Sequence, residues 1–162
     1  MTKNSFMMFE EYALPLFKDG MKVLEIGATP IENEFNLEKL VRKINVDYSN
    51  ADINGTVLKF RGGEVIDADN NTYDVVFCAN VIEHIARPWI WLKELVRVTK
   101  KGGKVIVLCP ITWGYHESPL DCWRIYPDGM RVLLTDSGLS VELVEMENLD
   151  ETEIDCLGIG VK

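Results

Sequence analysis

The sequence predicts one α/β domain built around a doubly wound, mostly parallel β-sheet with helices on both faces. Three observations predict it. An apolar segment, 22–26, ends at Gly27, where a strand turns towards a helix. The segments 73–79 and 104–109 are apolar without alternation, as expected of central strands that are covered on both faces. Segments with helical periodicity separate these strands, and this order is typical of parallel sheets.

The first part of the chain predicts one β-α-β unit. Residues 6–18 have the apolar spacing of an amphipathic helix, which Pro15 kinks or ends. A first strand follows at 22–26, and apolar residues within 35–41 form one face of a short helix. The second strand is expected near 44–47.

The second part of the chain continues the alternation. Pro88 suits the start of a helix over 88–100, and a strand follows at 104–109. Pro127 opens a further helix, for which Gly138 supplies the C-terminal cap. The last strand candidates are 141–146 and 156–161. In such a sheet, ligands bind at the carboxyl ends of the strands.

Composition limits the class of protein. The 162 residues, 47% of them hydrophobic and 27% charged, fit a single globular domain, 1–162. The net charge of −9 argues against nucleic acid or an anionic membrane as the main partner, because either would repel the chain. The apolar segments are too short to span a bilayer, and the N-terminus lacks the apolar core of a signal peptide. We therefore expect a cytoplasmic protein.

The cysteines predict neither a metal site nor a disulfide framework. They show no Cys-x-x-Cys spacing and no histidine cluster beside them, which favours reduced thiols. We expect no metal. The four are Cys78, Cys109, Cys122 and Cys156.

The turn after the first strand carries the main signal for a nucleotide site. Gly27 permits a positive φ and a close approach of a ligand to the backbone. Asp47 ends the next apolar segment about 20 positions later, roughly the spacing at which an acidic side chain meets ribose hydroxyls. An ordinary strand-to-helix turn and a surface aspartate are the alternatives.

Four blocks of the sequence resemble the class I S-adenosylmethionine-dependent methyltransferases, particularly the small bacterial methyltransferase domains. They are VLEIG (23–27), VD (46–47), YDVVFCANVIEHI (73–85) and LVRVTKKGGKV (95–105). A further block, HESPLDCWRIYPDG (116–129), is similar to the segment after the fifth strand in a subset of these enzymes. The resemblance implies a Rossmann-like sheet of seven strands with an antiparallel last strand. Because the chain ends early, we expect that strand to be short or missing.

The resemblance implies S-adenosylmethionine as the cofactor and assigns residues to it. Gly27 and Ala28 would contact its methionine part through the backbone, with Glu25 accepting from its amino group. For the adenine segment, 55–58 is the nearest match and 67–69 the rival. Thr29 and Pro30 stand where the family usually has a second glycine, which would narrow the pocket or weaken binding. The cofactor-binding candidates are Glu25, Gly27, Ala28, Asp47, Tyr48, Val57 and Asn80.

The segment after the fifth strand supplies the catalytic and acceptor-binding candidates. We assign His116 as the general base and Asp121 as its partner, the alternative being a histidine that only holds the loop. His84 is interpreted as a structural loop residue. Tyr115, Trp123 and Arg124 are the candidates for binding the acceptor substrate, the alternative being that they pin the loop onto the sheet.

These assignments imply methyl transfer to a small-molecule or glycan-precursor acceptor, with oxygen as the favoured atom. An N-terminal helix (1–20) would precede a cofactor-binding core (21–110) and a substrate-side loop, helix and terminal strands (111–162). The alternative is a catalytically silent domain that binds a partner or senses the cofactor. A nicotinamide dehydrogenase fits less well, because 27–30 lacks the three-glycine fingerprint. We expect no nucleic-acid or membrane partner, and a homodimer stays open.

Overall fold

The computed structural model describes residues 1–28, 34–52, 58–61, 65–117, 120–150 and 153–162. Its strands are β1 (Lys22–Ile26), β2 (Asp47–Asp52), β3 (Leu58–Arg61), β4 (Val65–Ile66), β5 (Tyr73–Ala79), β6 (Thr99–Pro110), β7 (Ser140–Asp150) and β8 (Glu153–Val161). Its helices are α1 (Lys3–Met8), α2 (Leu37–Val41), α3 (Pro88–Val98) and α4 (Pro127–Asp136). Three shorter helical turns are η1 (Phe9–Ala13), η2 (Leu14–Leu16) and η3 (Ile82–His84).

The strands form a mostly parallel sheet. Over the described ranges its eight strands lie in the order β4-β3-β2-β1-β5-β6-β8-β7. β1 pairs in parallel with β2 and β5, as do β2 with β3 and β5 with β6. β8 runs antiparallel between β6 and β7. The predicted doubly wound sheet with an antiparallel last strand is therefore confirmed.

The last strand is neither short nor missing, contrary to the expectation from the sequence. β8 pairs with β6 along its length, from Val161 opposite Lys104 to Asp155 opposite Pro110. The sequence predicts only the last six residues of this strand, 156–161, which include two glycines of low strand propensity. One of these glycines is required for packing, because a Cβ on Gly158 would lie 2.5 Å from Cγ of Met130 on α4.

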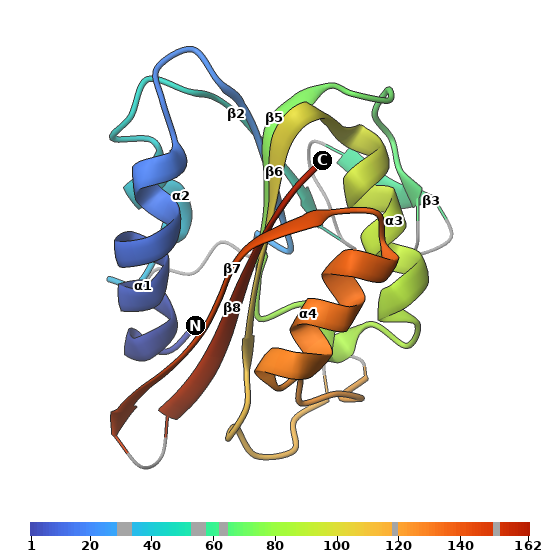
Figure 1. The fold of residues 1–162 in the computed structure, drawn as a ribbon. Coiled ribbons are helices and arrows are strands. Elements are labelled where there is room, and N and C mark those ends of the chain that lie inside the picture. Colours follow the sequence, from blue (N-terminus) through green and yellow to red (C-terminus); the bar gives the residue numbers. More distant parts are fainter. Residues whose placement is uncertain (29–33, 53–57, 62–64, 118–119, 151–152) are drawn as a thin grey trace.

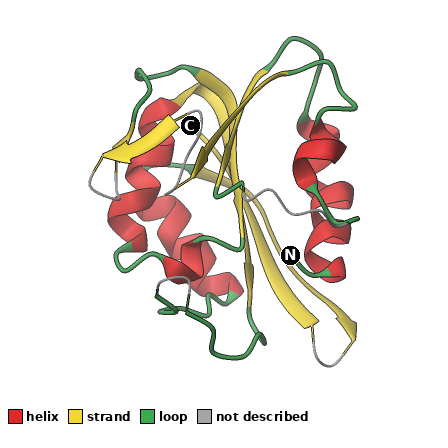
Figure 2. Ribbon diagram, turned by 180° about the vertical axis from the view of Figure 1, so that it is seen from behind, coloured by secondary structure: helices red, strands yellow, loops and turns green. Residues whose placement is uncertain are grey.

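Helices cover both faces of the sheet (Figures 1 and 2). α1 and α2 lie on one face, and α3 and α4 lie on the other. Val75 and Phe77 of β5 belong to the core under α1 and α2, whereas Val76 and Cys78 belong to the core under α3 and α4. Because successive side chains point to opposite faces, each central strand serves both cores. This explains why its sequence is apolar without alternation.

The N-terminal helical segment begins earlier than predicted and is not one continuous α-helix. α1 begins at Lys3, after Thr2, whose hydroxyl accepts from the N–H of Ser5. It passes into a π-helical turn at Phe9 and then into the 3-10 turn η2. Pro15 lacks an N–H and crowds the preceding turn, so the α-helical hydrogen-bond pattern cannot continue through it.

The predicted helix over 88–100 begins at Pro88 but ends at Val98. Thr99 already has extended backbone and is the first residue of β6. Among the described residues, no helix combines the length and the apolar composition that a membrane span requires.

Candidate active site

The turn after β1 accommodates only a glycine. Gly27 has a φ of +78°, and its N–H donates to the carbonyl of Ala51 over 2.7 Å. A Cβ at this position would lie 2.3 Å from Cγ2 of Val81, which follows β5. Backbone conformation and packing therefore both exclude a side chain at Gly27.

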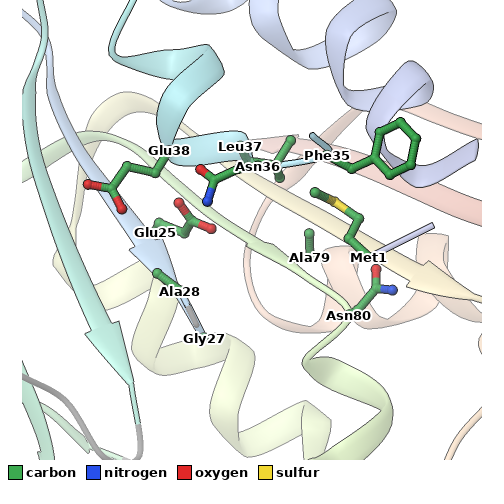
Figure 3. Close-up of a pocket in the computed structure, with 10 residues that line it drawn as sticks. All are labelled: Met1, Glu25, Gly27, Ala28, Phe35, Asn36, Leu37, Glu38, Ala79 and Asn80. Carbon is green, nitrogen blue, oxygen red and sulfur yellow. The ribbon is translucent and has the colours of Figure 1, made fainter. Parts of the chain in front are cut away.

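A cavity of about 140 Å³, which we call the turn cavity, lies beside Gly27 at the carboxyl ends of β1 and β5 (Figure 3). It brings together four of the cofactor-binding candidates, Glu25, Gly27, Ala28 and Asn80. The segment that leads into α2 closes it from the other side. Among the described residues, its wall consists of Met1, Glu25, Gly27, Ala28, Phe35, Asn36, Leu37, Glu38, Ala79 and Asn80.

Glu25 carries the buried carboxyl group of the turn cavity and is only 9% exposed. Burial raises the pKa of Glu25 from 4.5 to about 7, while the hydroxyl of Tyr48, which donates to Oε2 of Glu25, acts in the opposite direction. The guanidinium carbon of Arg42 lies 4.4 Å from the centroid of the Tyr48 ring. Tyr48 thus contacts Glu25 and Arg42 instead of lining the cavity.

Asp47 lies at the amino-terminal ends of β1 and β2, whereas Gly27 follows the carboxyl end of β1. Asp47 is the first residue of β2, it pairs in register with Lys22 at the start of β1, and its side chain is exposed. The structure therefore does not bring Asp47 to the turn cavity. The apolar segment 44–46, which we interpreted as the strand, precedes β2, and its apolar side chains pack against the core under α2. β2 instead ends at Asp52, beside Ala51.

Asn80 joins the turn cavity to a second cavity. Its φ of +56° is uncommon for a residue other than glycine, although asparagine tolerates it better than most residues. Its N–H donates to the carbonyl of Leu108 over 2.9 Å, and its Oδ1 accepts from the hydroxyl of Ser5 over 3.5 Å. The backbone and side chain of Asn80 are thus both held at the junction of the two cavities.

The second cavity, which we call the loop cavity, has a volume of about 420 Å³. It shares Met1, Phe35 and Asn80 with the turn cavity. Its other walls come from the N-terminus, η3, the loop after β6, and the start of β8. They are Thr2, His84, Pro110, Trp113, His116 and Glu153.

A buried ion pair holds the loop between β6 and α4. The side chain of Asp121 is 2% exposed and accepts from Nη1 and Nη2 of Arg124 over 2.6 and 2.9 Å. It also accepts from the N–H of His116 over 2.8 Å. The hydrogen bonds from Arg124 hold the pKa of Asp121 well below its usual range. Arg124 donates further to the carbonyls of Trp113 and Gly114, so this pair is committed to the structure of the loop.

The two histidines meet edge to face in the loop cavity. The ring centroids of His84 and His116 are 4.9 Å apart, with an angle of 88° between the planes. Nδ1 of His84 lies against the carbonyl of Leu120, and Nδ1 of His116 lies 2.9 Å from the carbonyl of Gly114. Because a carbonyl oxygen only accepts, each Nδ1 donates, and each neutral ring keeps its lone pair on Nε2.

Glu83 is a second buried carboxyl group and lies directly before His84. It is 1% exposed, and among the described residues its two carboxyl oxygens have no hydrogen-bond partner. Burial raises the pKa of Glu83 from 4.5 to about 7. Its backbone carbonyl accepts from the N–H groups of Cys122 and Trp123 over 2.8 and 3.2 Å, which docks the loop onto η3.

The three acceptor-binding candidates do not line the loop cavity. Tyr115 is 76% exposed, and its hydroxyl donates to a carboxylate oxygen of Glu117. Trp123 is 37% exposed and packs against Trp89, on a different surface. Arg124 is occupied by Asp121. The aromatic content of this segment predicts recognition of an acceptor, but from this segment only Trp113 and His116 are among the described residues that line the loop cavity.

Several cavity residues were missed by sequence reasoning. Met1, Phe35 and Glu153 reach the cavities from elements far apart in the chain, so no local pattern identifies them. Trp113 could have been found, because it precedes the predicted base by only a few residues. The predictions made for Val57 and for the turn at 29–30 lie outside the described residues.

The sheet order defines a Rossmann-like α/β protein, and two adjoining cavities at the carboxyl ends of its strands form the candidate site. Residues 24–107, more than half of the chain, match a family model described as "Methyltransferase domain". The chain therefore belongs to the methyltransferase domain family, and the resemblance found in its sequence is confirmed.

Relatives and solved structures agree with this family. A Mycolicibacterium gilvum protein named "Uncharacterized methyltransferase" is 39% identical over 70 residues, which cover 41% of this chain and 24% of the relative. The chain thus spans about a quarter of the length of the curated relatives it matches.

The structural likeness extends over nearly the whole chain. A SAM-dependent methyltransferase from Aquifex aeolicus has a TM-score of 0.67 at 20% identity, covering 97% of this chain and 89% of that one. Haemonchus contortus phosphoethanolamine N-methyltransferase 2, solved with S-adenosyl-L-methionine, has a TM-score of 0.70 at 12% identity, covering 98% and 52%. At these identities the likeness shows the fold, which is that of the SAM-dependent methyltransferases.

Proposed function

We propose that this domain binds S-adenosylmethionine in the turn cavity and transfers its methyl group to an acceptor held in the loop cavity. The observation that carries this proposal is that the two cavities adjoin and share Met1, Phe35 and Asn80. Methyl transfer requires donor and acceptor to be held in contact and in line, and adjoining cavities provide this arrangement. Membership of the methyltransferase domain family supports the reaction class.

The residues of the turn cavity fit the methionine end of the cofactor. A Cβ at Gly27 would fill the space beside Val81, so the glycine keeps the backbone accessible to a ligand. Glu25 offers a carboxyl group, and Asn80 offers an amide at the junction. A buried carboxyl of raised pKa gains a partner when an ammonium group binds beside it, and this would restore its ionised form.

The chain's own residues have a limited task in this reaction. When bound, S-adenosylmethionine supplies an activated methyl group on its sulfonium sulfur. Glu25 and the backbone of Gly27 hold the amino-acid end, and Asn80 defines the boundary with the acceptor. Met1 and Phe35 contribute apolar walls that exclude water from the junction.

We infer that the loop cavity takes a small acceptor that carries hydroxyl groups. Trp113 provides an aromatic wall, while His84 and His116 provide nitrogen lone pairs that accept from hydroxyls. We therefore favour oxygen as the methylated atom and a small molecule or glycan precursor as the acceptor. The cytoplasmic location and the homodimer stay predictions.

His116 stays our prediction for the general base, with Asp121 as a positioning residue. Asp121 binds the backbone N–H of His116 and lies 3.5 Å from its Nδ1, so it fixes the loop that carries the ring. Under saturating cofactor, His116→Ala should lower turnover, most strongly at low pH, where less of the acceptor hydroxyl is ionised. Turnover that is undiminished across the pH range would refute a base at this position.

Calorimetry with S-adenosylmethionine and with S-adenosylhomocysteine tests the cofactor proposal. We expect saturable heat with one molecule bound per chain, which Glu25→Ala abolishes. The alternative is a catalytically silent domain, which the modest volume of the turn cavity favours. Saturable binding without methyl transfer to any acceptor would support a cofactor-sensing role, and no saturable heat with either compound would overturn the cofactor proposal.

A further inference from the structure

The only two histidines of the chain lie together with a buried glutamate. Glu83 and His84 belong to η3, and His116 belongs to the loop after β6. One ligand atom from each side chain lies within 4.8 Å of the other two. Nε2 of His84 and Oε1 of Glu83 are 3.8 Å apart. The fold therefore brings together two imidazoles and a carboxylate from segments separated by a strand and a helix.

Both imidazole rings are oriented as metal ligands are. Backbone carbonyls of Leu120 and Gly114 take up the two Nδ1–H groups, which leaves Nε2 of His84 and His116 as lone-pair donors. Metal-binding histidines characteristically donate their other ring N–H to a carbonyl or a carboxylate, which fixes the tautomer. Asp121 adds a carboxylate oxygen 3.5 Å from Nδ1 of His116.

Glu83 is the independent observation that points to a cation. Both of its carboxyl oxygens are buried, and within the described part of the chain neither has a hydrogen-bond partner. A buried carboxylate without a partner is costly, and such groups are normally paired or coordinate a metal. The guanidinium of Arg124 donates two hydrogen bonds to Asp121; its charge lowers the pKa of Glu83, but no hydrogen bond joins these two groups.

We propose that Glu83, His84 and His116 bind a divalent first-row transition cation, with Zn²⁺ as the best match. Two imidazoles and one carboxylate form the ligand set of many catalytic zinc sites, which leave a coordination position open, whereas Mg²⁺ and Ca²⁺ prefer oxygen ligands. Ligand atoms that each lie about 2.0–2.1 Å from one tetrahedral ion are roughly 3.4 Å apart. The three ligand atoms here lie within 4.8 Å of one another, so each pair must come closer by at most about 1.5 Å. Side-chain torsions supply such a movement.

The open coordination position would face the acceptor. His84 and His116 line the loop cavity, so a cation on their Nε2 atoms would meet a molecule bound there. This part of the inference rests on the proposed function. A hydroxyl oxygen bound to the cation would lose its proton to water at lower pH. Its electron pair would then form the bond to the methyl carbon while the bond from that carbon to the sulfonium sulfur breaks, and the electron pair of the broken bond would stay on the sulfur. His116 would then act as a ligand and not as the base, because one lone pair cannot serve both roles.

Metal titration of the tag-free protein tests the site. After chelator treatment, Zn²⁺ calorimetry should show one cation bound per chain, and Co²⁺ should give the visible absorption of a low-symmetry site. His84→Gln and His116→Gln should each weaken binding by more than about a hundredfold, because each removes a direct ligand. The matched control is Cys122→Ser, which removes the exposed thiol beside the cluster and should leave binding and spectrum unchanged.

Two outcomes would overturn the site. One is the absence of saturable Zn²⁺ binding to the wild-type chain, and the other is binding that survives the double variant His84→Gln/His116→Gln. Circular dichroism verifies that each variant is folded. S-adenosylhomocysteine calorimetry on the chelated protein separates the two proposals. If S-adenosylhomocysteine binds and Zn²⁺ does not, only the cation site is rejected. If Zn²⁺ binds and S-adenosylhomocysteine does not, only the cofactor site is rejected.

Discussion

Glu25 and Glu83 show how burial changes the chemistry of a carboxyl group at this sheet edge. Glu25 follows the buried Leu24 in β1, and Glu83 follows the buried Ile82 in η3. Burial leaves little room for water beside either carboxyl group and raises the pKa of each to about 7. The pKa of Asp121, in contrast, lies below the usual range, because Arg124 donates two hydrogen bonds to it. Among the described residues, neither Glu25 nor Glu83 accepts a hydrogen bond from a cationic side chain.

The stability of the protein without ligand should fall as the pH rises, in part because of Glu25. A carboxyl whose pKa is raised in the folded state stabilises the fold below pH 4.5, and this contribution is lost as the pH rises through about 7. Glu25→Gln should therefore lose less stability between pH 5 and pH 8 than the wild type, by at most on the order of 3 kcal/mol. Urea unfolding at several pH values measures this.

Tyr48→Phe is the matched variant for that experiment. The hydroxyl of Tyr48 donates to Glu25 and lowers its pKa, so removing it should move the loss of stability to higher pH. Parallel pH profiles for the wild type and Glu25→Gln would contradict the assignment of the raised pKa to Glu25.

At the scale of elements, β8 and α4 depend on each other. α4 crosses the sheet over β8, and the bare Cα of Gly158 leaves room for Met130 and Leu134. A strand that looked weak in the sequence is therefore a central part of the core, because its glycines let the helix approach closely. The strand propensities of its residues therefore underestimate how well such a segment forms a strand in the folded protein.

Two glycine-to-alanine variants in this region should have opposite effects. Gly158→Ala places a Cβ 2.5 Å from Cγ of Met130, and we expect it to destabilise the fold by about 1–3 kcal/mol. Gly129→Ala, on the exposed side of α4, meets no atom closer than 3.5 Å and should stabilise by roughly 0.5–1 kcal/mol through helix propensity. Thermal and urea unfolding measure both. A neutral Gly158→Ala would show that Met130 moves aside without cost.

At the scale of the whole molecule, two layers of helices hold a sheet whose carboxyl edge carries both cavities. The turn cavity lies between β1 and β5, and the loop cavity lies beyond Asn80 on the side of β6 and β8. Met1 and Thr2 border the loop cavity directly. The residues directly before α1 therefore form part of the wall of the site.

Ligand binding should stabilise the whole domain. S-adenosylhomocysteine at a hundred times its dissociation constant should raise the free energy of unfolding by about 2.7 kcal/mol. For a chain of this length that corresponds to a rise in Tm of roughly 5–10 °C. Differential scanning calorimetry at increasing ligand concentration measures it. A Tm that does not respond at any concentration would contradict a folded, competent cofactor site.

The local pattern of the sequence determined the class of fold and the position of the first turn. Apolar segments without alternation identified β5 and β6, Pro88 and Pro127 marked the starts of α3 and α4, and Gly27 marked the turn. These predictions hold because strand burial, helix starts and positive φ depend on residues close together in the chain. The sequence blocks also sufficed to identify the family.

Only the tertiary structure decided which side chains meet. The register of β2 against β1 placed Asp47 at the end of the strands away from Gly27, and the path of the loop after β6 left Tyr115 and Trp123 outside the lining of the loop cavity. The same path brought His116 to Glu83 and His84. Register and loop path depend on packing between distant segments, and a periodicity read along the chain contains no information about that packing.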